Sequence, residues 1–180
     1  ASGGGWHSLV VARDGRVYGA GSNGHGQLTG SAEEKRALRL VRGLPDGVRA
    51  ASAAAGDLHS LVVADTGRVY GTGSNWIGQL TGTGEKTTLT RLTGLPAGIR
   101  ATSAAAGDSH SLVVADDGRV YGAGDNGLGQ LTGTATPKRT LTALKGLPAG
   151  VRATAAAGGD SFSLVLADDV RDEVPGALAA

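Results

Sequence analysis

The chain has 180 residues, of which 40% are hydrophobic and 18% are charged, and its formal net charge is +1 at pH 7. This composition fits one soluble globular unit and gives no reason to expect a nucleic acid partner, a disordered chain or a membrane span. Because the chain contains no cysteine, disulfides and cysteine-ligated metal sites are excluded and the compartment stays open, although we favour an intracellular location.

A long internal repeat accounts for the unusual glycine content of the chain, which has 32 glycines but only 3% aromatic residues. The segment HSLVV begins at His7, His59 and His110, and a related segment, FSLVL, begins at Phe162. These starts are 52, 51 and 52 residues apart. A period of this length is typical of architectures in which each repeat is one supersecondary unit that stacks on its neighbours.

Each repeat predicts four short strands in chain order, as the second copy illustrates. The β-branched run at residues 59–64 and the run at residues 68–71 flank the turn-forming segment Asp65–Gly67, which is a hairpin signature. Residues 88–95 alternate threonine or arginine with leucine, the period-two pattern of a half-buried strand. Residues 99–106 combine alanines with β-branched residues, which favours a strand over a short helix. Four strands per repeat, with the smallest residues in the strand nearest the axis, are the layout of a β-propeller blade.

A dinucleotide-binding loop is suggested by Gly19, Gly21 and Gly24, which spell GxGxxG after the apolar pair Val17–Tyr18. That site requires a helix directly after the glycine turn, with its N-terminus facing the pyrophosphate. Here the glycines open a turn rich in Gly and Asn, which is a poor start for a helix. The second repeat also has Trp76 in place of the third glycine. We therefore reject the nucleotide-binding interpretation and expect no cofactor.

Residues 56–80, GDLHSLVVADTGRVYGTGSNWIGQL, resemble the repeat of the regulator of chromosome condensation family, whose pattern is G-x-x-H-S-L, then D-G-x-V-Y, then G-x-N-x-x-G-Q-L. The match recurs three times in full and once in part, up to about Asp169. The resemblance implies an all-β protein, a β-propeller with blades of four antiparallel strands, used for binding rather than for chemistry on small substrates. Propellers of this family usually have about seven blades, so the chain supplies about three and a half.

We divide the chain into repeats at residues 1–50, 51–101 and 102–153, an incomplete repeat at 154–169 and a non-repeat C-terminal tail at 170–180. Each repeat normally buries its faces against neighbours on both sides. The two end repeats would therefore each leave one face bare. Three arrangements would cover these faces: a longer polypeptide, two copies that close a ring, or other chains.

One departure from the family pattern concerns the packing between blades. The family commonly has a tryptophan before the glycine that follows the Val-Tyr strand. Here that place holds Ala20, Thr72 and Ala123. We expect the packing between blades to be thinner or differently arranged.

The sequence offers no catalytic group that the repeat does not explain. The three histidines are conceivable metal ligands. However, each heads an apolar strand, and Phe162 takes the same place in the fourth repeat, so we interpret them as buried packing residues that make one hydrogen bond. The carboxylates beside glycine fit hairpin turns, where Asp is favoured for local hydrogen bonding: Asp14, Asp65, Asp116 and Asp117. We predict that the chain has no catalytic, cofactor or metal site and that it is not an enzyme.

Basic residues gather in the connections between repeats, with Lys35, Arg36 and Arg39 in the first. If these connections share a face, they would form a positive arc able to meet an acidic protein or a phosphate backbone. Glu33 and Glu34 interleave with them, and aromatic partners for base stacking are lacking, which favours a solvated surface. We keep the three basic residues as candidate contacts for a protein partner. A second recurrent set follows Gly-Val or Gly-Ile and is interpreted as structural: Arg49, Arg100 and Arg152.

Trp76 and Ile77 are the least repeat-like residues of the chain, because the other copies have Gly24–His25 and Gly127–Leu128 at their place. A tryptophan where the architecture accepts glycine is not required by the blade. Exposed aromatic residues are enriched at interaction hot spots. We therefore take Trp76, Ile77, His25 and Leu128 as candidate partner contacts, with a local packing role for Trp76 as the alternative.

These features predict a non-catalytic protein–protein interaction module, a propeller scaffold or assembly subunit that binds partners through its blade-connecting loops. The expected partner is a protein: another propeller half, a second copy or a larger complex. The alternative that the resemblance implies is a guanine-nucleotide exchange factor for a Ran-type small GTPase with chromatin association. In the family that activity relies on loop insertions, and repeat intervals of 51 and 52 residues leave none between copies here.

Overall fold

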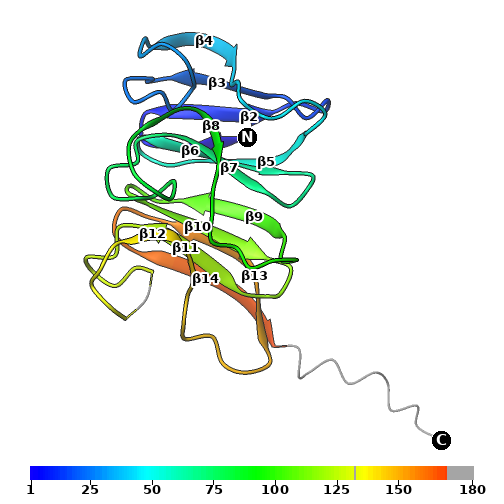
Figure 1. Ribbon diagram of the computed structural model, residues 1–180, viewed down its shortest axis with the longest axis vertical. Helices are drawn as coiled ribbons and strands as arrows, with labels where there is room; N and C mark the ends of the chain where they lie inside the picture. Colours follow the sequence, from blue (N-terminus) through cyan, green and yellow to red (C-terminus); the bar gives the residue numbers. More distant parts are fainter. Residues whose placement is uncertain (132, 170–180) are drawn as a thin grey trace, which may run out of the picture.

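The computed structural model describes residues 1–131 and 133–169, so the tail predicted at residues 170–180 lies outside the described residues. Within this part the regular secondary structure consists of strands, arranged as separate antiparallel sheets that follow one another in chain order along the long axis (Figure 1). No helix of the described residues is long and apolar enough to cross a membrane.

Three of the sheets are four-stranded, and we call them blades 1, 2 and 3. Blade 1 contains β1 (Ser2–Gly3), β2 (His7–Val11), β3 (Val17–Gly21) and β4 (Lys35–Leu40). Blade 2 contains β5 (Ala50–Ala55), β6 (His59–Ala64), β7 (Val69–Gly73) and β8 (Lys86–Arg91). Blade 3 contains β9 (Ala101–Ala106), β10 (His110–Ala115), β11 (Val120–Gly124) and β12 (Lys138–Ala143). Blade 4 is the pair of β13 (Val151–Gly158) and β14 (Ser163–Asp169), which confirms the prediction of a partial, all-β array of four-stranded blades.

The hairpin between the second and third strands of blades 1, 2 and 3 is closed by a glycine and held by the next blade. In blade 2, Gly67 has a φ of +73° and its N–H donates to the carbonyl of Ala64 at 2.8 Å. The guanidinium of Arg100, from blade 3, donates to the carbonyl of Asp65 at 2.8 Å. Equivalent bonds run from Arg49 to the carbonyl of Arg13 and from Arg152 to the carbonyl of Asp116. The interpretation of these arginines as structural is confirmed.

The first strands of successive blades lie side by side, and this crowding explains their small residues. A Cβ added to Gly4 would lie 2.0 Å from the carbonyl oxygen of Gly56, and one added to Gly107 would lie 2.4 Å from that of Gly159. Side chains larger than alanine have little room at such a separation. The alanine and glycine content of this strand therefore follows from its place between neighbouring blades.

The hydrophobic core lies between the blades, because successive residues of a strand point to opposite sides. In β6, Leu61 and Val63 pack with Val113 of blade 3, whereas Val62 packs with Leu9 of blade 1. We call the side of a blade that meets the next blade in chain order its following face, and the opposite side its preceding face. Each interface therefore joins the following face of one blade to the preceding face of the next.

Thr72 occupies one of the places where the family commonly has tryptophan, and it joins blades through hydrogen bonds instead of bulk. Its side chain is buried, and Oγ1 lies 2.7 Å from the carbonyl oxygens of both Gly26 in blade 1 and Lys86. The packing at this position is thus differently arranged, as expected.

Candidate functional site

A histidine–serine pair, which we call the latch, joins each blade to the next. Nε2 of His7 lies 2.8 Å from Oγ of Ser60, and Nε2 of His59 lies 3.0 Å from Oγ of Ser111. The third latch joins Nε2 of His110 to Oγ of Ser163 at 3.0 Å. The prediction that the histidines are buried and make one side-chain hydrogen bond is confirmed.

The latch has a defined direction. Oγ of Ser60 donates to the carbonyl of Gln27 at 2.7 Å, and Oγ of Ser111 donates to that of Gln79 at 2.7 Å. A serine has one hydroxyl proton, so each hydroxyl accepts the hydrogen bond from histidine, and Nε2 carries the imidazole proton. Nδ1 of the latch histidines is buried without a hydrogen-bond partner: His7, His59 and His110.

This environment keeps the latch histidines neutral. Burial lowers the pKa of His7 from 6.5 to about 4. Burial, followed by repulsion from the neighbouring latch histidines, lowers the pKa of His59 from 6.5 to about 3. Burial also lowers the pKa of His110. Burial is the dominant cause, and it outweighs the backbone groups of Asp57 and Phe162, which favour the charged forms of His7 and His110 respectively.

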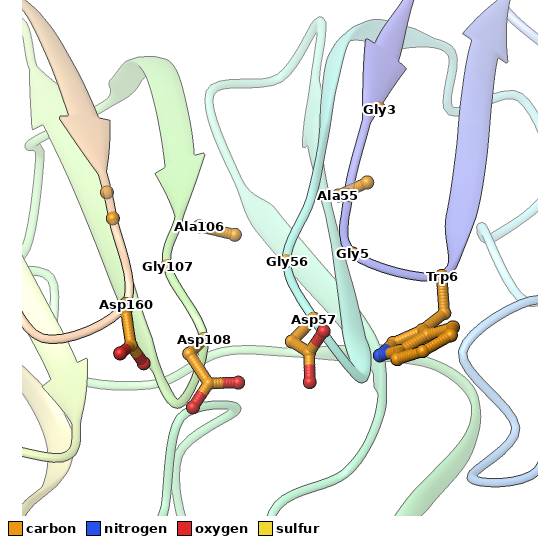
Figure 2. Close-up of a pocket in the computed structure, with 13 residues that line it drawn as sticks. Gly3, Gly5, Trp6, Ala55, Gly56, Asp57, Ala106, Gly107, Asp108 and Asp160 are labelled. Atoms are coloured by element: carbon orange, nitrogen blue, oxygen red, sulfur yellow. The ribbon is translucent and has the colours of Figure 1, made fainter.

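A hollow of about 590 Å³ lies at the ends of the first strands, and Figure 2 shows its acidic side. Asp57, Asp108 and Asp160 stand in a row there, one from each of blades 2, 3 and 4, with Trp6 at the end of the row. In blade 1 the same place holds Gly5. The backbone fixes this spacing, since the N–H groups of Asp57 and Asp108 each donate to a carbonyl of the next blade, at 3.4 and 3.2 Å.

The acidic row was not predicted from the sequence. Burial, followed by a hydrogen bond and charge repulsion from Asp57, raises the pKa of Asp108 above its ordinary value. The signal was the dipeptide Gly-Asp, whose glycine comes three residues before His59, His110 and Phe162, in every repeat but the first. Among the described residues, no group of three or more acidic or histidine side chains has an arrangement suited to a metal ion.

The loop carrying Trp76 exposes a large aromatic side chain. The indole is 66% exposed, although the ring of His25 packs edge-on against it, with centroids 5.3 Å apart and planes at 88°. Nδ1 of His25 lies 2.6 Å from a carboxylate oxygen of Glu85. The carbonyl of Trp76 accepts a hydrogen bond from Arg139 of blade 3 at 3.4 Å. The structure therefore brings together two of the candidate contacts, Trp76 and His25, from different blades.

The other two apolar candidates lie in equivalent loops. Ile77 is half-buried beside Trp76, and its N–H donates to the side chain of Gln79 at 3.2 Å. Leu128 is 80% exposed, and its N–H makes the same bond to Gln130 at 3.0 Å. Both loops thus make the same bond to a glutamine side chain, while the side chains at the tip vary.

The basic candidates lie apart from this loop, on strand β4 of blade 1. Arg36 and Arg39 are exposed, and Nε of Arg36 lies 3.9 Å from a carboxylate oxygen of Glu34. Lys35 is half-buried and donates to the Ser31 hydroxyl at 3.1 Å. An ion pair this exposed adds little stability. The local charge is mixed, as the interleaved glutamates in the sequence suggested.

Comparison with known proteins places these features in a family. The model for the regulator of chromosome condensation (RCC1) repeat matches residues 1–27, 50–75 and 101–130. The chain belongs to the RCC1 repeat family. Its RCC1 repeats are 35% identical over 140 residues to the human probable E3 ubiquitin-protein ligase HERC6, covering 74% of this chain and 14% of that protein. They are 36% identical over 129 residues to the RCC2 homolog of Danio rerio, covering 69% of this chain and 26% of that protein.

Solved structures show the same fold. Yeast RCC1 (Prp20), in a crystal structure with Kap60, matches with a TM-score of 0.80 and 23% identity over 95% of this chain. Human WBSCR16 matches with a TM-score of 0.77 and 27% identity over 89% of this chain. In both cases the RCC1 repeats described above cover 42% of the solved chain. The chain thus spans less than half the length of these relatives.

Proposed function

We propose that this chain is a non-catalytic interaction module, a propeller scaffold or assembly subunit, which binds a protein partner through its blade-connecting loops. The observation that carries the proposal is the 66% exposure of Trp76 at a place that Gly24 and Gly127 occupy in the neighbouring blades. The blade does not need this side chain for its own core. Tryptophan is among the residues that dominate the binding energy of protein interfaces.

The loop is also organised in advance for binding. His25 packs against one side of the indole and is itself held by Glu85. Arg139 holds the backbone of the loop from blade 3. Ordering a loop on binding costs free energy, so a loop already fixed by two neighbouring blades retains more of its contact energy as affinity.

Leu128 adds a second exposed apolar side chain in the equivalent loop of the next blade, where it is 80% exposed. Ile77 follows Trp76 directly and occupies the repeat position that Leu128 occupies in blade 3. Lys35, Arg36 and Arg39 would contact the partner only at the rim, since they lie on β4. Rim charges influence the association rate more than the affinity.

Binding of proteins is described for solved members of this fold. One structure shows yeast RCC1 (Prp20) bound to Kap60, and another concerns the binding of Prp20p to Gsp1p and histones. Sequence identities of 23% and 24% to these structures show that this chain has the same fold, but they do not assign the same partners to it. Guanine-nucleotide exchange on a Ran-type GTPase with chromatin association is the alternative that an experiment must separate from scaffolding.

The test compares two variants that each remove one exposed apolar side chain. Trp76→Ala alters the proposed contact, and Leu38→Ala alters β4, where Leu38 is 56% exposed. Proteins retained by the immobilised chain are identified, purified and titrated against both variants. We expect Trp76→Ala to weaken binding about 30-fold, the size of a hot-spot loss of about 2 kcal/mol, and Leu38→Ala to change it less than about twofold.

Equal affinity of the Trp76→Ala and unsubstituted chains would overturn the proposal. A separate assay follows the release of a labelled guanine nucleotide from a Ran-type GTPase. Acceleration by the unsubstituted chain would replace the scaffold function with nucleotide exchange.

A further inference from the structure

A carboxylate belongs to the cluster around the exposed indole of Trp76. Oε1 of Glu85 lies 2.6 Å from Nδ1 of His25, whose ring packs at right angles to the indole. The loop backbone holds the carboxylate on the same side, because the buried amide of Asn75 donates to the carbonyl of Gly84 at 3.1 Å. Trp76 and Glu85 directly follow these two residues in sequence. The two side chains therefore leave neighbouring points of one loop, and His25 contacts both.

The charge of Glu85 has no fixed counter-charge. Within the described residues its ion-pair partner is His25, and histidine carries no permanent charge. Lys86 and Arg139 donate instead to backbone carbonyls of the loop, at 2.9 and 3.4 Å. The side chain of Glu85 is 35% exposed, so water still reaches its carboxylate. The chain thus presents an exposed indole beside a partly hydrated negative charge.

A protein that covers the indole of Trp76 must also remove water from this carboxylate. Burying a charged group without a counter-charge is costly. A purely apolar partner surface would leave Glu85 in that state, and an acidic partner surface would add charge repulsion. The partner therefore has to supply a cation at this place.

Arginine suits both parts of the cluster better than lysine does. Its planar guanidinium stacks on the face of an aromatic ring and presents N–H groups in a fixed fork to a carboxylate. Tryptophan is the aromatic side chain that attracts a cation best. The ammonium of lysine is more strongly hydrated and has no flat face to stack.

We propose that the Trp76 loop recognises an arginine side chain of the protein partner. The guanidinium stacks on the indole of Trp76 and donates to the carboxylate of Glu85, which His25 holds beside the indole. This specificity rests on the proposed interaction function, because the same loop makes the contact. Blade 1 supplies a contrast, since Glu34 precedes β4 as Glu85 precedes β8, but Gly24 stands there in the place of Trp76.

The test uses N-acetyl-arginine methylamide as the probe and N-acetyl-citrulline methylamide as its uncharged counterpart of similar shape. NMR follows the indole N–H signal of Trp76 during titration of the 180-residue chain. The Trp6→Phe variant assigns that signal, since Trp6 and Trp76 are the chain's two tryptophans. We expect the arginine probe to shift the signal with a dissociation constant on the order of millimolar, and the citrulline probe to bind at least about fivefold more weakly.

Glu85→Gln should weaken binding of the arginine probe about threefold to fivefold, because it removes the charge and keeps the shape. Glu34→Gln is the matched control and should change the binding less than about twofold. Both glutamates are exposed, so neither change disturbs the core. N-acetyl-lysine methylamide should bind more weakly than the arginine probe.

Equal affinity for the arginine and citrulline probes, or an unchanged affinity in Glu85→Gln, would overturn the assignment of arginine. The partner retained by the immobilised chain separates this failure from that of the interaction function. We expect Trp76→Ala and Glu85→Gln, but not Glu34→Gln, to weaken its binding. A loss in Trp76→Ala alone would show that the loop binds a partner without recognising arginine. No loss in either variant would overturn the interaction function itself.

Discussion

Nε2 of His59 donates a hydrogen bond to Oγ of Ser111 over 3.0 Å, although the two residues belong to different blades. The hydroxyl of Ser111 in turn donates a hydrogen bond to the carbonyl of Gln79, in the blade of His59, at 2.7 Å. The pair therefore satisfies three buried polar groups at once. In a repeat protein, where each unit contacts only its neighbours, such a bond acts directly on the coupling between adjacent units.

Ser111→Ala should lower the free energy of unfolding by about 1–3 kcal/mol, because it leaves the N–H of His59 and the carbonyl of Gln79 buried without partners. Ser8→Ala is the matched control, since Ser8 is the equivalent residue at an exposed position. Chemical denaturation of both variants measures the difference. Equal losses would show that serine acts within its own strand and not through the latch.

The sequence predicted the strands and the buried histidines well, for a physical reason. The repeat HSLVV followed by a glycine turn and RVYG specifies a hairpin locally, and both strands appear as β6 and β7. Adjacent residues of a strand point to opposite faces, so His59 and Ser60 had to serve different interfaces. The missing step was that the partner of each histidine is the serine of the next repeat.

The contact between Trp76 and His25 could not be predicted in the same way. The two residues lie in loops of different blades, and their approach to 5.3 Å depends on the angle between blades. That angle results from packing along the whole interface and not from local sequence. The acidic row of Asp57, Asp108 and Asp160 also depends on blade geometry. The repeated Gly-Asp dipeptide indicated only that an aspartate recurs at one place in the repeat.

Acid should destabilise the protein through the latch histidines. The pKa of His7 is lowered from 6.5 to about 4 and that of His59 to about 3. Unfolded chains bind protons below about pH 6.5 while these folded histidines stay neutral, so their stabilisation is complete above that pH and is lost as the pH falls toward 4 and 3. Each contributes a slope of up to about 1.36 kcal/mol per pH unit. Denaturation midpoints between pH 7 and 4.5 measure it.

His59→Phe supplies the control for this pH dependence, because Phe162 already occupies the latch position in the fourth repeat. The variant should lose stability at neutral pH yet show a shallower decline below pH 6.5, by about one proton's contribution. Asp108, whose pKa is raised, makes stability increase as the pH falls, which opposes the effect of the histidines. It is present in both proteins, so it does not affect the comparison. An unaltered slope in His59→Phe would assign the acid sensitivity to other groups.

Arg100→Ala should destabilise the junction between blades 2 and 3 at the hairpin between β6 and β7. The guanidinium donates to the carbonyl of Asp65 at 2.8 Å, and its stem lies against Gly67. Losing the bond and this contact should lower the free energy of unfolding by about 1 kcal/mol. Arg68→Ala is the control, since Arg68 is an exposed arginine at the same hairpin. Hydrogen exchange at the Gly67 amide should rise in the first variant and stay constant in the second.

Gly107→Ala should strongly destabilise the protein, because the added methyl group would clash with the latch histidine His110. A Cβ there would lie 2.2 Å from Cε1 of His110 and 2.4 Å from the carbonyl oxygen of Gly159. The first contact would displace the latch histidine. The second would separate the backbones of blades 3 and 4, where the N–H of Asp108 donates to that same carbonyl. Overpacking of this kind typically costs about 1–3 kcal/mol, and we expect a loss at the upper end because neither neighbour is a flexible side-chain tip.

The control for this prediction is Gly24→Ala, at an exposed loop position where an added Cβ meets no atom within 4 Å. Its free energy of unfolding should change by less than about 0.5 kcal/mol. Urea denaturation followed by tryptophan fluorescence compares both variants with the unsubstituted chain. Because the clash acts between blades, Gly107→Ala should also broaden the transition as blade 4 uncouples from blade 3. A sharp transition at the original midpoint would show that the first strands tolerate a wider spacing than the histidine latch implies.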